Sequence, residues 1–95
     1  MKELEILIIG KHHDIMKTIL RLINNKPGWK GNGTFTVDEA LTLSKTIAFN
    51  IVLLGAGLSE SESGQIKAHF TVPVVQHYGG GSGLLYAEIY EAVGS

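Results

Sequence analysis

Short runs of aliphatic residues alternate along the chain with stretches in which apolar residues recur at helical spacing. The clearest run is Ile51 to Leu54, four consecutive aliphatic residues that stop at Gly55. A run without polar alternation is typical of a strand buried on both faces of a parallel sheet. Residues 6–9 form a similar run, and residues 71–76 are predicted to form another strand, with Pro73 near its start. Residues 34–36 are the best candidate for a short strand at the sheet edge.

A helix is predicted after the first strand, because apolar residues recur every three or four positions over residues 15–23. We expect His13 or Asp14 to cap its N-terminus. The helix should end near residue 25, because Pro27 cannot continue it.

Two further helices begin at capping boxes, in which a hydroxyl oxygen and a glutamate three residues later satisfy each other's free backbone amides. Thr36 with Glu39 predicts a helix of about three turns, and Ser59 with Glu62 predicts one that ends near His69. The last segment leaves two options. It forms one helix over residues 84–93, or a very short strand followed by a turn or two of helix.

Strands that alternate with helices are typical of parallel sheets with right-handed crossovers. The pattern therefore predicts a doubly wound, mostly parallel sheet of four to five strands, covered by helices on both faces in a three-layer α/β/α arrangement. We expect residues 1–95 to form a single domain, since this length is near the lower end of the usual domain size.

The composition excludes several classes of function. A formal net charge of −1 with scattered lysines and arginines gives no case for nucleic-acid binding. The absence of cysteine excludes disulfides, thiolate metal sites and thiol catalysis. No apolar stretch approaches the roughly 20 residues that span a bilayer. We therefore expect a soluble, cytoplasmic protein with neither nucleic acid nor membrane as a partner.

Ligands of open α/β sheets bind beyond the carboxyl ends of the strands, and this chain carries little chemistry there. The third strand ends in Gly55, Ala56 and Gly57, which have no functional group, and the first ends in Gly10 and Lys11. No pair of carboxylates and no nucleophile with a neighbouring base follows either strand. The sequence therefore predicts no catalytic residue at this edge.

Histidines are the remaining candidates for a ligand or metal site at the same edge. His12 and His13 follow the first strand, and His77 follows the last clear strand together with the glycine-rich loop of residues 79–83. Imidazole is a common metal ligand. However, we expect the Gly55 strand to separate the two groups by about 9–10 Å, which is two strand spacings.

Four segments resemble the receiver domain of bacterial response regulators. Residues 6–15 resemble its first strand and the start of its first helix, and residues 37–41 resemble the start of its second helix. Residues 49–55 resemble its third strand, and residues 72–78 its fourth. The spacing of these segments matches the family as well, and the resemblance covers about residues 4–79. It implies a flavodoxin-like fold and a role in signal transduction, as in two-component systems.

The residues that carry phosphorylation in that family are replaced here. The resemblance places its Mg²⁺-binding acidic pair at Gly10 and Lys11, its acceptor aspartate at Gly55, and its hydroxyl residue at Tyr78. It therefore implies a degenerate pseudo-receiver, without enzyme activity, metal or cofactor, that acts through a protein partner or by self-association as a homodimer. The Lys11 ammonium is expected to replace the charge of the missing ion.

A second resemblance supports the alternative of a small ligand- or metal-binding domain. Residues 11–17 are similar to the Asp-x-His-x-x-Gly stretch of cobalamin-binding domains, which places His13 at the cobalt-ligand position. The aspartate of that motif is Lys11 here, its glycine is Met16, and the serine expected after the third strand is Gly55.

Overall fold

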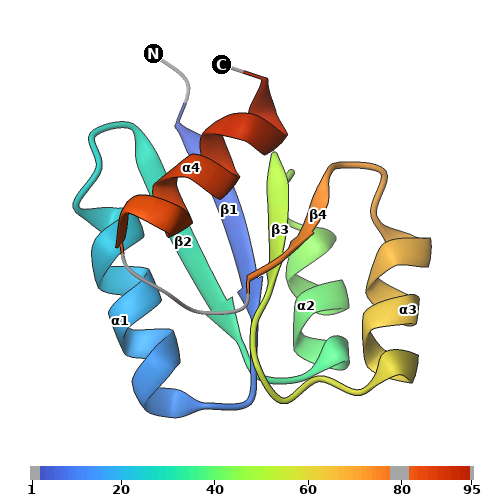
Figure 1. Cartoon of the computed structure of the whole chain (residues 1–95). Coiled ribbons are helices and arrows are strands. Elements are labelled where there is room, and N and C mark those ends of the chain that lie inside the picture. The colour runs from blue at the N-terminus through green and yellow to red at the C-terminus, as the bar shows by residue number, and fades with distance from the viewer. Residues whose placement is uncertain (1–2, 78–81, 95) are drawn as a thin grey trace.

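The computed structural model describes residues 3–77 and 82–94, and it contains a four-stranded parallel sheet between two layers of helices (Figure 1). The strand order is β2-β1-β3-β4. The elements in chain order are β1 (Leu4–Ile9), α1 (His13–Asn24), β2 (Trp29–Thr34), α2 (Val37–Ser44), β3 (Ile51–Leu54), α3 (Glu60–His69), β4 (Val74–Gln76) and α4 (Ser82–Val93). The predicted doubly wound, flavodoxin-like fold is confirmed.

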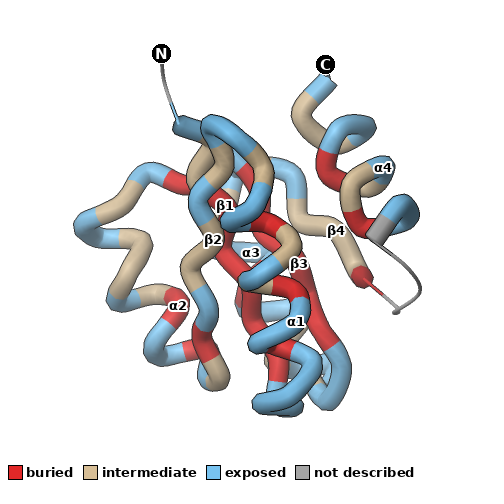
Figure 2. Tube along the Cα trace, turned by 90° about the vertical axis from the view of Figure 1, so that its left-hand side faces the viewer, coloured by how far each residue is buried: buried red, intermediate tan, exposed pale blue. Residues whose placement is uncertain are grey.

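Alternating side chains of β1 and β3 divide the core into two clusters. Ile6 and Leu53 belong to the cluster beneath α1 and α4, which also contains Ile19 and Ile89. Leu7 and Val52 face the opposite way, in a cluster with Ala40 of α2 and Ile66 of α3. Figure 2 shows the buried residues concentrated along β1 and β3. The predicted three-layer arrangement follows from these two buried faces.

The second strand is longer than predicted and lies earlier in the chain. It pairs with β1 from Trp29 to Thr34, whereas the sequence pattern placed it at residues 34–36. Its glycines explain the difference. A Cβ atom on Gly33 would lie 2.9 Å from the Met16 sulfur and 3.0 Å from a Leu20 methyl carbon. The strand lacks a hydrophobic pattern of its own because side chains of α1 fill the space above it.

Both predicted capping boxes are present at the starts of α2 and α3. The predicted cap of α1 is wrong: the N-cap residue is His12, and its side chain makes no capping hydrogen bond. The second helix is also shorter than the predicted three turns, since it ends at Ser44 after 8 residues.

The C-terminal part of the chain resolves one open question and corrects another expectation. Residues 82–93 form the single helix α4, in which Leu85 and Ile89 are buried. The fourth strand begins at Val74 rather than at residue 71, because its pairing with β3 starts opposite Val52. Pro73 lies just before the strand and accepts a hydrogen bond from the Val52 amide through its carbonyl oxygen.

Candidate functional site

The carboxyl ends of β1 and β3 lie against each other through two glycines. A Cβ atom on Gly10 would lie 3.5 Å from the Gly55 Cα atom, and one on Gly55 would lie 3.2 Å from the Ile9 carbonyl oxygen. The Gly55 amide donates to Ile9, and the Lys11 amide donates to Ala56. Backbone atoms therefore occupy the place where larger residues would present functional groups.

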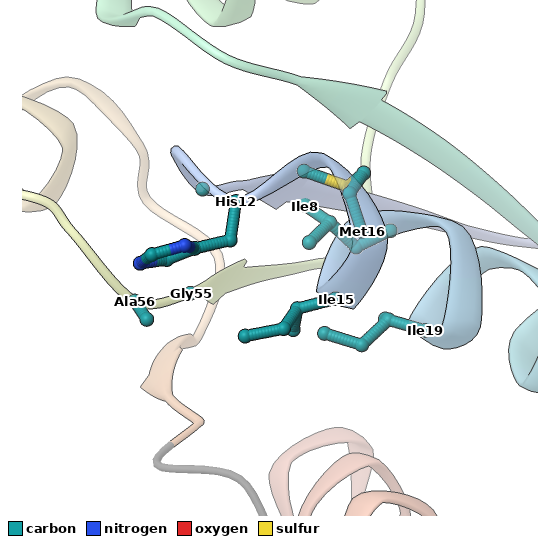
Figure 3. A pocket seen from close by; sticks show the side chains of 8 residues that line it. Ile8, His12, Ile15, Met16, Ile19, Gly55 and Ala56 are labelled. Atoms are coloured by element: carbon teal, nitrogen blue, oxygen red, sulfur yellow. The ribbon is translucent and has the colours of Figure 1, made fainter.

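A small apolar cavity lies beside these glycines, between the strand ends and α1 (Figure 3). Its free volume is about 10 Å³. A cavity of roughly this size accommodates one water molecule at most. Figure 3 shows the His12 ring extending toward Ala56 at the rim, with Ile15 and Met16 on the side of α1. The cavity has no room for a small organic ligand.

Lys11 extends past the carboxyl ends of β1 and β3 and forms an ion pair with Glu62 at the start of α3. Its ammonium nitrogen lies 2.9 Å from a Glu62 carboxylate oxygen, and both side chains are partly exposed. The aliphatic part of Lys11 passes over Gly57, where any Cβ atom would lie 2.8 Å from the Lys11 Cβ atom. Gly57 also has φ of +93°, a conformation that favours glycine. The lysine therefore ties the end of β1 to α3.

The Glu62 carboxylate has two partners at this position. It accepts a hydrogen bond from the Ser59 backbone amide in the capping box and one from the Lys11 ammonium. The Ser59 amide, followed by Lys11, lowers the pKa of the Glu62 carboxyl below its ordinary value. The carboxylate is thus held in its charged form, in a structural role.

The candidate histidines are not brought together. His12 is exposed, and the His13 ring stacks on Phe35 with 4.2 Å between the ring centroids. His77 is buried, with 7% of its surface exposed, and lies at the end of β4 beyond β3. Within residues 3–77 and 82–94, no group of three histidines, aspartates or glutamates is arranged to hold a metal ion. Tyr78 and the glycines that follow it to residue 81 lie outside the described residues.

His77 has a partner that the sequence pattern missed. Its Nδ1 atom lies 2.5 Å from a Glu88 carboxylate oxygen on α4. Glu88 lies three residues after Leu85 and one before Ile89, so it shares the buried face of the helix. An acidic residue on an inward helical face indicates a buried polar partner, and this signal is available in the sequence.

Comparison with known proteins identifies the fold. No protein-family model and no curated protein matches this sequence. Among solved structures, a fusion carrying the trimeric coiled-coil segment of yeast Spc42 is similar with a TM-score of 0.78, at 18% identity over 98% of this chain and 80% of that one. The signal receiver domain of an HD domain-containing protein from Pseudomonas fluorescens Pf-5 has a TM-score of 0.66, at 16% identity over 99% of this chain and 72% of that one.

These identities are low enough that the similarity shows the fold alone. This chain has the fold of a signal receiver domain, as the resemblance implied. None of the described helices is long and apolar enough to cross a membrane.

Proposed function

We propose that this chain is a pseudo-receiver, a non-catalytic signalling or interaction module that is not phosphorylated on aspartate. The observation that carries the proposal is the absence of carboxylates at Gly10, Lys11 and Gly55, where the receiver fold has its reactive edge. Transfer of a phosphoryl group to the protein requires a nucleophile and a cation that offsets the phosphate charge. Glycine and lysine side chains supply no acceptor carboxylate and no metal ligand.

The packing at this edge supports the same proposal. An aspartate at position 55 would place its Cβ atom 3.2 Å from the Ile9 carbonyl oxygen, closer than ordinary contact. The nearby Glu62 carboxylate is engaged by Ser59 and Lys11, so it acts as a helix cap rather than as a nucleophile. A module of this kind works by binding a protein partner, without a cofactor.

A phosphorylation assay tests this proposal. The protein is incubated with acetyl phosphate and Mg²⁺ and examined by mass spectrometry, and a ¹⁵N-labelled sample is titrated with beryllofluoride and Mg²⁺. A receiver domain that retains its acidic residues serves as the positive control. We expect no phosphoryl adduct and no saturable shift of the Gly10, Lys11 or Gly55 amides.

A Mg²⁺-dependent shift centred on Gly55, or an adduct that hydroxylamine removes, would overturn the proposal. In that event the variant Glu62→Gln shows whether the Glu62 carboxylate carries the phosphoryl group. An adduct that survives this substitution would identify a different acceptor.

A further inference from the structure

The outer side of β4 is an open edge of the sheet. The strand order ends at β4, and among the described residues no strand pairs with its outer side. The Val52 amide donates to the Pro73 carbonyl group, and the His77 amide donates to the Leu54 carbonyl group. The backbone groups of Pro73 and His77 therefore face β3. Because backbone groups alternate in direction along a strand, Val74 and Gln76 direct their N–H and C=O groups outward.

The proline next to this strand does not protect the open side. The Pro73 carbonyl group faces β3. Because the N–H and C=O groups of one strand residue point the same way, the N–H group that proline lacks would also have faced β3. The outward side of Val74 and Gln76 therefore retains two donors and two acceptors. A strand that exposes such groups is a template for pairing with another chain.

The opposite edge of the sheet is protected in a way that β4 is not. Along β2 the Gly31 amide, which points away from β1, donates a hydrogen bond to the Asn24 side-chain oxygen. The strand also carries the exposed charge of Lys30, which disfavours pairing with another strand. The three residues of β4 include no charged side chain. The contrast indicates that the β4 edge is the one suited to binding.

A groove with an acidic wall runs beside this edge, between β4 and α4. It has a volume of about 430 Å³ and is lined by Pro73, Val75, Glu88, Glu91 and Ala92. Glu88 is paired with His77, whereas Glu91 is exposed on the surface of the helix. The side chains on one face of an added strand would lie over this groove.

We propose that the open side of β4 binds an extended, basic segment of a partner protein, which adds a fifth strand to the sheet. Main-chain hydrogen bonds to Val74 and Gln76 would hold the segment, and a lysine or arginine would lie against Glu91. The charge of the groove favours such a partner over a second copy of this chain. Two copies paired edge to edge would place Glu88 and Glu91 of both on the same face, where like charges repel.

This inference deepens the interaction role proposed above, but it uses a different part of the molecule. The strand is short, with two outward residues, so specificity comes from the groove and its charge. A negative result at β4 leaves the phosphorylation assay at Gly55 unaffected, and phosphorylation near Gly55 would leave binding at β4 unaffected. The two proposals therefore fail separately.

A peptide titration followed by ¹⁵N NMR tests the inference. The probe is Thr-Val-Lys-Val-Lys-Val-Thr with blocked ends, which places its lysines on one face of an extended strand. We expect saturable shifts of the Val74 and Gln76 amides and slower exchange of both with solvent. The same peptide with glutamates in place of lysines should bind about tenfold more weakly, because the charge steers and orients the pair. A version with alternate amides methylated should lose binding.

Charge reversal in the groove provides the matched variant. Glu91→Lys should weaken binding of the lysine peptide about tenfold and make the glutamate peptide the better ligand. Asp38→Lys makes the same change of charge on the exposed surface of α2, beside the other sheet edge, and should leave both affinities unchanged.

Three results would each overturn the inference. The first is the absence of saturable shifts at β4, and the second is equal binding of the lysine and glutamate peptides. The third is a concentration-dependent shift of Val74 and Gln76 without peptide, accompanied by a dimer in sedimentation, which would assign the edge to a second copy.

Discussion

The partly exposed Glu62 carboxylate contacts two elements of the fold. It accepts a hydrogen bond from the Ser59 amide within the capping box of α3, and it pairs with Lys11 from the end of β1. Both partners favour the charged form, so the pKa of Glu62 is lower in the folded chain than in the unfolded chain. The stabilisation it contributes is fully present above the unfolded pKa and is lost as the pH falls through the folded pKa.

Removing the Lys11 side chain should show how much each of the two partners lowers the pKa of Glu62. In Lys11→Met the pKa of Glu62 should rise, yet stay below its ordinary value because the Ser59 amide still donates to the carboxylate. An NMR titration of the Glu62 carboxyl carbon in wild type and in Lys11→Met measures the pKa in each protein. Lys17→Met, which removes an exposed lysine of α1, should leave this pKa unchanged. An unaltered pKa in Lys11→Met would show that the ion pair does not act on Glu62.

Gly57 is needed for the same connection, because the backbone and the neighbouring lysine both exclude a side chain there. Its φ is +93°, and a Cβ atom would lie 2.8 Å from the Lys11 Cβ atom. We expect Gly57→Ala to lower the free energy of unfolding by about 1–3 kcal/mol, the usual cost of a strained backbone conformation. Urea unfolding followed by circular dichroism measures the change.

The matched control for this substitution is another glycine of the same region. Gly64 lies inside α3, and a Cβ atom there would meet nothing within 4 Å. Gly64→Ala should therefore raise the free energy of unfolding by about 0.5–1 kcal/mol, since alanine favours the helix over the unfolded chain. Equal effects of the two alanines would contradict the role assigned to Gly57.

At the scale of elements, the sequence predicts those whose pattern lies within their own residues. Ile51–Leu54 is uniformly aliphatic because both faces of β3 are covered, and the capping boxes identify the starts of α2 and α3. The second strand is different. Gly31 and Gly33 carry no side chain, and their place in the sheet follows from the bulk of α1 above them. Only the packed structure contains that information.

The candidate site likewise combines features that the sequence predicts with features that only the folded chain shows. The edge that joins Gly10 and Gly55 could be predicted, since each glycine directly follows a predicted strand and parallel strands end together. The ion pair between Lys11 and Glu62 could not, because it depends on how α3 returns past Gly57. The pairing of His77 with Glu88 also required a single helix at the end of the chain, one of two options that the sequence left open.

At the scale of the whole molecule, α4 packs against the sheet and also contacts the turn after α1. Leu85 and Ile89 pack on the sheet. Beyond the sheet, the Lys26 ammonium, from the turn after α1, lies 4.5 Å from the Tyr86 ring centroid and 5.3 Å from that of Tyr90. Trp29 is the third ring of this aromatic cluster, and its centroid lies 5.7 Å from the Lys26 ammonium nitrogen. Figure 1 shows α4 lying across the sheet on the same side as α1. The cluster thus links the last helix to the first half of the chain.

The charge of Lys26 should therefore contribute to the stability of the entire domain. Lys26→Gln removes the cation from the three rings and should lower the free energy of unfolding by about 1 kcal/mol. Lys26→Arg should retain most of it, because a guanidinium also stacks on aromatic faces. Lys30→Gln, at an exposed position of β2, should change the value by no more than about 0.5 kcal/mol.

Unfolding in urea, followed by the fluorescence of the single tryptophan, reports on this cluster directly, because Trp29 is one of its three rings. The circular dichroism signal should follow the same curve in wild type, since α4 and the sheet share one core. An equal loss of stability in the glutamine and arginine variants would mean that shape, and not charge, joins α4 to the turn after α1.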